Sequence, residues 1–483
     1  MYKRMTRRGL LRSAALVVPA ALLAACEPKV VEKIVKETVI KEVEKVVKET
    51  VIVEKEVAAP PEGKVEIEWW HAWGGTTGIA ALANCAQAFN EEERDVTVNR
   101  LQVPNMSDKL LAAIAAGTPP DVGVCCIPYA SYYARGAMTP IDDYVSASEL
   151  VNPEDFLPTF IHSMTWQGKL QGVPACECGP RFGLLYNRDT MRELGVKEED
   201  LPTTWSEMRE MLPAMSKFDD AGNVEIVGFD PMGGTADRPP TPNISMFWAE
   251  NFGMDVWDEQ TLTFNFDDER LAQALALVTE FYDFYGGIEK VAAWSGSFMG
   301  GSQSPTGAFP TGGLTTQVYG YWAAGEMPHS SPGMDFHVTW VPVPDFRKGT
   351  KCQGTGGHPI YIPKGAKHPD EAWEFMEWIT MPTACELIFK ATGWFGGRKE
   401  YYDANHPWLV DKPALQWYLN SSAEADDTWE NPVIPNQGFV VQEWVRIREA
   451  VSYGDMTPSE AVTELQKSCT EDLHREFPEL FGG

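Results

Sequence analysis

Aromatic and polar side chains gather where predicted strands give way to loops. Apolar residues at 65, 67 and 69 alternate with glutamates, which predicts a half-buried strand that ends near residue 70. A strand end beside a helix N-terminus presents rings and backbone N–H groups to a ligand. The loop that follows this strand therefore carries three candidate ligand contacts: Trp70, His71 and Trp73.

Similar candidates recur further along the chain. Gly357 allows close backbone approach to a ligand, and His358 beside it can donate or accept a hydrogen bond. Arg181 could bind hydroxyls, or it could instead select an anionic group such as a carboxylate or phosphate. In ligand sites, aromatic rings pack against apolar parts of the ligand while a few polar groups fix its orientation. The other candidate contacts are Tyr129, Glu177, Tyr319, Tyr321, Trp322, Trp394 and Phe395.

The same sequence carries no recognisable catalytic apparatus. It contains no nucleophile elbow, zinc-binding helix or phosphate loop. Carboxylates are too numerous to single out a glycosidase pair, whose separation a sequence does not give. The formal charge of −29 argues against nucleic acid and anionic membrane surfaces as partners. We therefore predict a non-enzymatic protein without catalytic residues, metal or cofactor.

The segment 168–205 is the most informative for the elements that position these residues. An apolar run at 182–186 predicts a strand. Asn187 is predicted to cap a helix that continues through Leu194 and ends at Gly195. Thr204, followed by Glu207, predicts the capped start of another helix.

This segment, GKLxGVPxxxxxxxLLYNRDxxxxLGVxxxxxPTTWxEM, resembles the crossover region of bacterial extracellular solute-binding proteins, the ligand receptors of ABC importers. KLLAAIAAGTPPDV and GGHPIYIPKGAKHPDEAWEFMEWI are similar to the same family, in its sugar-binding branch, and the ordered matches span 64–475. In the maltose-binding relatives the tryptophan that matches Trp322 stacks on sugar. Tyr319 and Tyr321 depart from that pattern, so the stacking could be shared. The segment 391–398 also departs from the usual G-x-x-P-x-R, with Trp394 and Phe395 in the ligand-facing places.

The resemblance implies an α/β, two-lobed periplasmic-binding-protein-like fold of type II, in which each lobe is a sheet flanked by helices and three crossings join the lobes. Lobe 1 is expected to comprise 64–175 and 341–392, and lobe 2 to comprise 176–340 and 393–483. The implied function is capture of a sugar or oligosaccharide in the cleft and its delivery to ABC-transporter permease subunits. Two alternatives are a non-sugar solute, either anionic or amine, and a secreted glycoside hydrolase.

The N-terminal residues predict an exported, lipid-anchored protein. Residues 1–25 combine a twin-arginine-like motif with a short apolar run, and Cys26 completes a lipobox, so lipidation at Cys26 would tether the protein outside the cytoplasm. An uncleaved signal anchor is the alternative. Residues 26–63 include a Val/Lys/Glu repeat, which is either a self-associating stalk or a solvated linker.

Eight further cysteines invite two interpretations. Because an exported protein permits disulfides, they could be buried thiols with one or two ordinary bridges. Alternatively, the pairs 125/126 and 176/178 at predicted cleft edges could form a soft-metal site or a bridge that pins the hinge. Adjacent cysteines in a strand point to opposite faces and cannot jointly bind one ion without distortion. The bridge that we predict for testing joins Cys85 to one of the vicinal pair.

Overall fold

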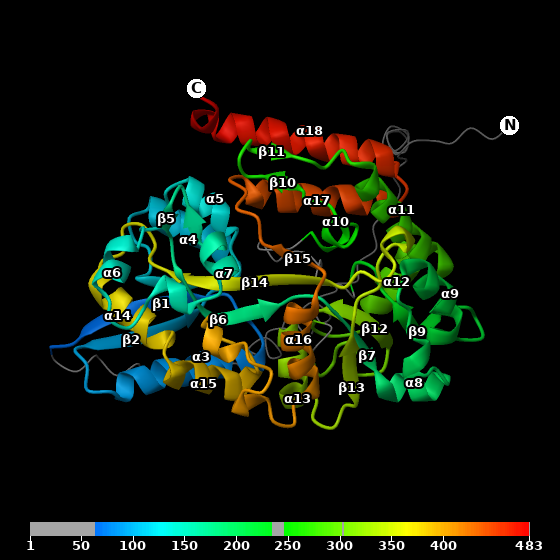
Figure 1. Cartoon of the computed structure of the whole chain (residues 1–483), viewed down its shortest axis with the longest axis horizontal. Helices are drawn as coiled ribbons and strands as arrows, with labels where there is room; N and C mark the ends of the chain where they lie inside the picture. Colours follow the sequence, from blue (N-terminus) through cyan, green and yellow to red (C-terminus); the bar gives the residue numbers. More distant parts are fainter. Residues whose placement is uncertain (1–62, 234–245, 302–303, 483) are drawn as a thin grey trace, which may run out of the picture. The chain divides into compact units, whose positions relative to one another are not determined.

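The computed structural model describes residues 63–233, 246–301 and 304–482 (Figure 1). The chain divides into two compact units, Met1–Ala59 and Pro60–Gly483, and the description below concerns the second. The predicted export signal, Cys26 and the repeat at 27–57 lie outside the described residues. Among the helices that are described, none has the length and apolar character needed to cross a membrane.

The first sheet is mixed and contains the strand that opens the described chain. Its order is β15-β14-β3-β1-β2, and β6 pairs with β14 in addition. β1 lies parallel to β2 and β3, whereas β14 runs antiparallel to β3 and β6. The strands are β1 (Val65–His71), β2 (Val96–Gln102), β3 (Val122–Val124), β6 (Val173–Pro180), β14 (Cys352–Tyr361) and β15 (Asp427–Glu430).

Helices cover both faces of this sheet, as the alternation in β1 requires. Trp69 is wholly buried and packs edge-on against Phe375 at 4.9 Å. Trp70 points the other way, into an apolar cluster that includes Met106 and Tyr132. One face carries α3 (Thr76–Glu91), α14 (Pro369–Ile379) and α15 (Pro382–Thr392), and the other carries α4 (Met106–Ala115) and α5 (Tyr129–Ala134) (Figure 1). α6 (Asp142–Ala147) packs beside α14, where Tyr144 stacks on Trp373 at 5.6 Å, and α7 (Pro158–Ser163) contacts β6, β14 and β15. The small hairpin β4 (Thr165–Trp166) and β5 (Lys169–Leu170) follows.

The second sheet has the order β13-β7-β12-β9-β8. Its strands are β7 (Gly183–Asn187), β8 (Lys217–Phe218), β9 (Val224–Phe229), β12 (Leu314–Tyr319) and β13 (Phe336–Thr339). Trp205 anchors its core, wholly buried at 4.9 Å from the Trp248 ring. The helices around it are α9 (Trp205–Met215), α10 (Phe247–Asn251), α11 (Glu269–Phe284), α12 (Ile288–Ser295), α13 (Tyr321–Ser330) and α16 (Pro413–Glu424).

A further layer packs on α11 and ends the described chain. α17 (Gln437–Ser452) lies beside α18 (Pro458–Glu476), and α18 also contacts the hairpin of β10 (Trp257–Asp258) and β11 (Thr263–Phe264) (Figure 1). Hydrogen bonds join this layer to α5: the Ala130 N–H donates to Gln437 Oε1 at 3.3 Å, and the Gly438 N–H donates to Ser131 Oγ at 3.1 Å. α5 of the first sheet is thereby attached to the C-terminal layer.

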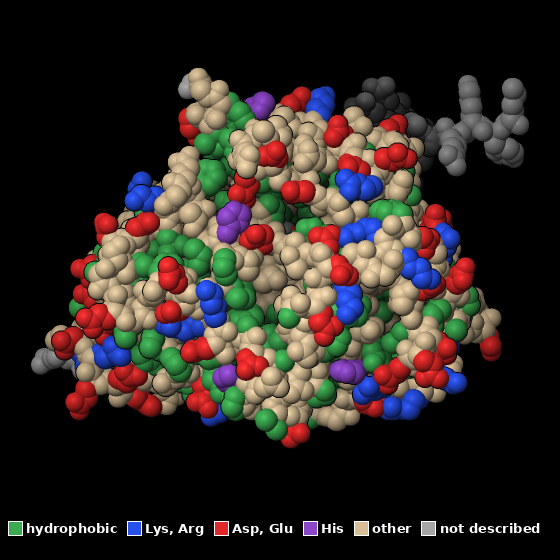
Figure 2. Space-filling model, viewed as in Figure 1, with side chains coloured by type: hydrophobic (Ala, Val, Ile, Leu, Met, Phe, Trp, Pro, Cys, Tyr) green, Lys and Arg blue, Asp and Glu red, His purple; other side chains and the backbone are tan. Residues whose placement is uncertain are grey.

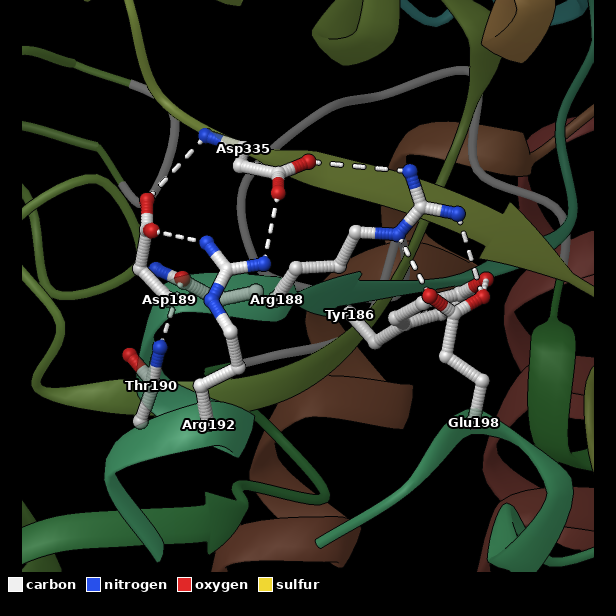
Figure 3. A network of polar contacts seen from close by, with 8 residues as sticks. Tyr186, Arg188, Asp189, Thr190, Arg192, Glu198 and Asp335 are labelled. Carbon is white, nitrogen blue, oxygen red and sulfur yellow. Dashed lines mark hydrogen bonds and ion pairs between the residues drawn. The ribbon is translucent and has the colours of Figure 1, made fainter. Parts of the chain in front are cut away.

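The crossover from β6 to β7 has the local structure that its sequence predicts. α8 (Arg188–Leu194) follows β7 directly, the Asn187 side chain accepts a hydrogen bond from the Thr190 N–H at 3.1 Å, and Gly195 ends the helix with φ 74°. Charged side chains then fasten α8 to its neighbours (Figure 3). Arg192 Nη1 lies 2.7 Å from Asp335 Oδ2 just before β13, and Arg188 Nε donates to Glu198 Oε1 at 2.7 Å.

The chain returns to the first sheet from β13 to β14, and a later segment brings the two halves into close contact again. After α15, Gly393 has φ 73° and lies against Gly325 of α13. A Cβ atom at Gly325 would come within 2.5 Å of the Thr392 carbonyl oxygen, so only glycine permits this approach. Trp394 and Phe395 are thus held at the junction of elements from both sheets.

Candidate functional site

A row of buried polar groups crosses the strands that join the two sheets. His358 on β14 lies beside β6, because Gly357 is paired with Cys178. His358 Nε2 is 2.8 Å from Glu177 Oε2, and its Nδ1 is 3.0 Å from the Tyr129 hydroxyl. Burial raises the pKa of Glu177, but His358, Arg181 and Tyr321 outweigh it, so the pKa stays below its ordinary value. Glu177 is therefore an ionised acceptor in the interior.

Arg181 extends this row at the end of β6. Its side chain is 8% exposed, and the guanidinium lies over the Trp322 ring at 5.6 Å from the centroid. A Cβ atom at Gly356 would stand 2.2 Å from Arg181 Nε, so glycine leaves the room that the guanidinium occupies. Within the described residues, Arg181 Nε and Nη2 are buried without a hydrogen-bond partner. Unpaired buried cations are costly, so these N–H groups are suited to a ligand.

Indole rings flank the polar row from the first sheet. Trp73, half-buried just after β1, meets His358 edge-on at 5.3 Å and the Trp394 ring at 5.0 Å. Trp394 in turn packs on Gly78 of α3, where a Cβ atom would come within 2.8 Å of the ring. Its Nε1 donates to Glu326 Oε1 at 2.9 Å.

A second group of rings stands where β12 leads into α13. Trp322 is half-buried and lies 5.7 Å from the Tyr319 ring. A side chain at Gly320 would collide with the Trp322 ring, since a Cβ atom would lie 1.8 Å from Cζ3. Tyr321 is wholly buried and stacks on Phe395 at 5.0 Å with an interplanar angle of 24°. This group therefore combines an accessible ring with a packed one.

The structure brings together most of the residues singled out from the sequence. The contacts above connect eight of them: Trp73, Tyr129, Glu177, Arg181, Tyr321, Trp322, His358 and Trp394. Tyr319 adjoins this group through Trp322, and Gly357 adjoins it as the neighbour of His358. Phe395 is 1% exposed, with its ring packed among Tyr321, Phe389 and Tyr402.

Trp70 and His71 lie at the margin of this group, where the His71 ring is 6.5 Å from the Trp73 ring. Trp70 Nε1 donates to Glu68 Oε1 on the α4–α5 side of the sheet. His71 is wholly buried, and its Nε2 lies 2.5 Å from Arg100 Nη1. Burial, assisted by the Arg100 charge, lowers the pKa of His71 to about 4, so the ring is neutral near pH 7.

One carboxyl group in the site escaped the sequence-based prediction. Burial raises the pKa of Glu326 to about 7, with a further increase from the Glu177 charge and a partial offset from the Trp394 hydrogen bond. Glu326 follows Trp322 by four residues, so the two share a face of α13. The four-residue spacing from Trp322 was therefore the sequence signal that could have identified Glu326.

The disulfide in the structure differs from the predicted one. Cys125 and Cys126 are joined to each other, whereas Cys85 is a buried free thiol, so the prediction of a bridge to Cys85 was wrong. α3 directs Cys85 toward α15, where its Sγ lies 3.9 Å from the Ala384 carbonyl oxygen, away from the end of β3. Among the described residues no cluster of His, Cys, Asp or Glu is arranged to hold a metal ion.

The visible surface carries charged side chains of both signs. Figure 2 shows acidic side chains spread across one face with basic side chains among them. On that face they form mixed neighbourhoods rather than a continuous basic surface.

Comparison with known proteins identifies relatives of limited similarity. The arabinooligosaccharide-binding protein of Bacillus subtilis is 23% identical over 289 residues, which is 59% of this chain and 62% of that protein. The sn-glycerol-3-phosphate-binding periplasmic protein UgpB of Escherichia coli is 28% identical over 149 residues, 29% of this chain and 33% of that protein. The matches thus span less than two thirds of either relative.

Solved structures resemble this one over nearly the whole described chain. CpMnBP1 with mannotriose bound gives a TM-score of 0.73 at 22% identity, covering 84% of this chain and 100% of that one. The maltose/maltodextrin-binding domain MalE from Bdellovibrio bacteriovorus, bound to maltotriose, gives 0.67 at 16% identity, covering 85% and 100%. These likenesses confirm the predicted α/β periplasmic-binding-protein fold.

A family model described as bacterial extracellular solute-binding protein matches residues 84–416, well over half of the chain. The match includes the crossover strands, the close contact between Gly325 and Gly393, and most of the candidate site. This chain belongs to the bacterial extracellular solute-binding protein family.

Proposed function

We propose that this protein is the extracytoplasmic receptor of an ABC importer, which captures a sugar or oligosaccharide and delivers it to the membrane permease. The observation that carries the proposal is the polar row of Tyr129, His358, Glu177 and Arg181 with indole rings beside it. Members of a solute-binding family bind their ligand without transforming it. Two of the proteins compared above bind mannotriose and maltotriose, and one is named for arabinooligosaccharides.

In the proposed binding mode, aromatic rings pack on the sugar ring and polar groups bind its hydroxyls. Trp73 and Trp322 are half-buried, so each can keep one face for the C–H surface of a sugar ring. Arg181 offers N–H donors, and the ionised Glu177 offers an acceptor. Of two neighbouring sugar hydroxyls, one can accept a hydrogen bond from Arg181 and the other can donate one to Glu177. This pair of hydrogen bonds fixes the orientation of the sugar.

Ligand capture would proceed by closure of two lobes. The lobes proposed are 64–175 with 341–392, and 176–340 with 393–483. The site draws Trp73 and Tyr129 from the first and Trp322 and Trp394 from the second, so a ligand that touches both sets favours the closed arrangement. Closure then presents a surface that the permease can distinguish from the open receptor.

The N-terminal sequence supports an extracytoplasmic location for the receptor. Export by the signal at 1–25 and lipidation of Cys26 would hold the binding unit at the outer side of the cell membrane. The repeat that follows would act as stalk or linker between anchor and receptor. Small-molecule solute, permease and membrane are the proposed partners.

Arg181 supports a second candidate, an anionic solute. A buried guanidinium with two N–H groups that lack a hydrogen-bond partner among the described residues suits a carboxylate or phosphate as well as hydroxyls. UgpB, one of the partial relatives, is named for sn-glycerol-3-phosphate. Both candidates use the same site and differ in the charge of the ligand.

A thermal-shift screen of the chain from Pro60 tests the proposal. The panel holds mono-, di- and oligosaccharides, with sugar phosphates, uronates, amino acids, polyamines and metals as the other arms. A ligand at one hundred times its dissociation constant adds about 2.7 kcal/mol to the free energy of unfolding. Shifts from neutral oligosaccharides support the sugar receptor, shifts confined to anions support the second candidate, and turnover of a labelled oligosaccharide would contradict both.

A further inference from the structure

The bridged cysteines stand at the level of the site, directly after β3. β3 lies between β1 and β14, with Val124 paired to His71 on one side and to Ile360 on the other. Cys126 follows Val124 by two residues, Trp73 follows His71 by two, and His358 precedes Ile360 by two, so all three lie at the same edge of the sheet. The Trp73 and His358 rings meet edge-on at 5.3 Å, so the disulfide follows a strand that ends at the sheet edge carrying this contact.

Tyr129, four residues after Cys125, places the disulfide loop beside the polar row. Burial raises the pKa of Tyr129, the nearby Cys125 backbone partly opposes that rise, and the Tyr129 hydroxyl lies 3.0 Å from His358 Nδ1. His358 is in turn 2.8 Å from Glu177. The loop that carries the disulfide therefore positions Tyr129, and through it the histidine–glutamate pair.

The backbone at the bridge is unusual, and its exposure is asymmetric. Cys125 and Cys126 have φ angles of 70° and 63°, a left-handed conformation that side-chain-bearing residues rarely adopt. Cys125 is wholly buried, whereas Cys126 is only half-buried. Oxidation in the described chain is confined to this pair, because the remaining six cysteines are buried free thiols: Cys85, Cys176, Cys178, Cys352, Cys385 and Cys469.

We propose that the Cys125–Cys126 disulfide is itself a ligand-contacting surface of the solute site, on which the C–H face of a sugar ring packs beside Trp73 and His358. This inference rests on the proposed sugar-binding function. The bridge presents two polarizable sulfur atoms and their methylene groups, without a hydrogen-bond donor. It therefore resembles an aromatic face in character while occupying less space.

Opening the bridge should weaken binding for two reasons. Two thiols are bulkier and more mobile than one bridge, so the flat sulfur surface is lost. The loop is also released from its left-handed conformation, and Tyr129, which follows it directly, then loses its fixed position. A water-soluble phosphine performs the reduction: it passes two electrons to the S–S bond, water supplies both thiol protons, and the phosphine leaves as its oxide.

Calorimetric titration of the oxidised full-length chain with mannotriose and with maltotriose tests ligand contact. We expect phosphine treatment, and the double substitution Cys125→Ser with Cys126→Ser, each to lower the affinity for the bound probe about tenfold or more. Phosphine should have no effect on the double variant. Cys469→Ser removes a buried thiol on α18 as the control, and its affinity should equal that of the parent. Equal affinity before and after reduction would overturn the inference.

A second readout does not depend on ligand and covers the case in which the double variant fails to fold. Disulfides quench the emission of an adjacent indole, so reduction should increase tryptophan fluorescence in the parent and increase it less in Trp73→Phe. An equal increase in both proteins would contradict the location beside Trp73. If the oxidised parent binds no sugar at all, the proposed function fails and the ligand contact fails with it, whatever the fluorescence shows.

Discussion

At the scale of single residues, the site holds two carboxyl groups in opposite states. Glu177 is kept ionised by His358 and Arg181 despite its burial, whereas burial raises the pKa of Glu326 to about 7. The difference follows from partners: Glu177 faces positive charge, while Glu326 receives only the indole N–H of Trp394. Glu326 is therefore the site carboxyl that titrates near neutral pH.

The substitution Glu326→Gln should change how stability depends on pH. The folded protein retains the Glu326 proton up to about pH 7, whereas the unfolded chain releases it near the ordinary value of 4.5. Between these values the folded state binds more protons, so its stability falls as pH rises, and the full cost is present above the folded pKa. Urea unfolding at two pH values, about 5 and about 8, should show the variant gaining about 1–3 kcal/mol relative to the parent at the higher pH.

An exposed glutamate supplies the control for this prediction. Glu386 forms an i,i+4 pair with Lys390 on the surface of α15, so Glu386→Gln should leave the pH profile nearly unchanged. A stability difference between Glu326→Gln and the parent that is the same at both pH values would contradict the assignment.

Arg181→Gln should separate binding from stability. The Nε and Nη2 groups of the buried guanidinium have no hydrogen-bond partner among the described residues, whereas its charge helps to keep Glu177 ionised. These two effects oppose each other, so removal of the cation should leave the free energy of unfolding nearly unchanged. Ligand affinity should fall by about tenfold or more, because charge-assisted hydrogen bonds contribute about 1.5–3 kcal/mol. Arg192→Gln, in the surface network of Figure 3, should leave affinity unchanged. Loss of stability without loss of affinity in Arg181→Gln would show a structural role instead.

Residue types and strand ends were sufficient to single out most of the residues that the structure brings together in the candidate site. His71 was expected to contact the ligand, but the two-residue alternation of a strand explains its burial. Trp69 and His71 are two residues apart on β1, so a buried Trp69 places His71 on the same buried face. The bridge between Cys125 and Cys126 was unpredictable because it depends on left-handed backbone at two consecutive residues, which no local pattern signals.

At the scale of elements, capping residues in the sequence predicted where the crossover helix begins and ends. Asn187 caps α8 and Gly195 ends it, as predicted, and Thr204 forms a capping box with Glu207 at the start of α9. β15 was not predicted, because its pairing with β14 joins residues more than seventy positions apart and its four residues alternate weakly. Pairing between residues so far apart in the sequence depends on contacts within the assembled sheet, and a local sequence pattern carries no information about those contacts.

Asn187→Ala should destabilise the protein without altering its ligand preference. The side chain caps α8 through the Thr190 N–H and also donates to the Phe309 carbonyl oxygen at 2.8 Å. Loss of an N-cap costs about 1 kcal/mol, and the unpaired Phe309 carbonyl adds about 1 kcal/mol more. Urea unfolding should show this decrease, whereas Asn405→Ala, which alters only an exposed turn, should not. An unchanged midpoint in Asn187→Ala would contradict the capping role.

At the scale of the whole binding unit, a charged contact joins α7 to the C-terminal layer. His162 Nε2 lies 3.1 Å from Glu259 Oε2, and its Nδ1 lies 3.3 Å from Glu430 Oε2. Hydrogen bonds to these two carboxylates raise the pKa of His162 to about 10, so the ring is protonated at neutral pH. His162 and Glu259 belong to different proposed lobes, and their contact should favour the closed arrangement.

His162→Gln should therefore weaken ligand binding several-fold and remove a pH-dependent part of the stability. The folded pKa lies above the ordinary value of 6.5, so the stabilisation is complete below about pH 6.5 and disappears as pH rises through about 10. The melting temperature of the parent should exceed that of the variant at pH 6, and the two should converge at pH 10. A constant difference across this range would contradict the contact between the lobes.

The central claim is that a sugar stacks on a ring at the start of α13, and calorimetry with mannotriose and maltotriose on Trp322→Ala tests it most directly. Trp340→Ala is the matched control, since that half-buried indole packs on Trp417 outside the site. We expect the parent and Trp340→Ala to bind at least one probe with equal affinity, and Trp322→Ala to lose about 1–3 kcal/mol of binding free energy, the range measured for truncated aromatic contacts. Equal affinity in Trp322→Ala, or no binding of any oligosaccharide by the parent, would contradict the account.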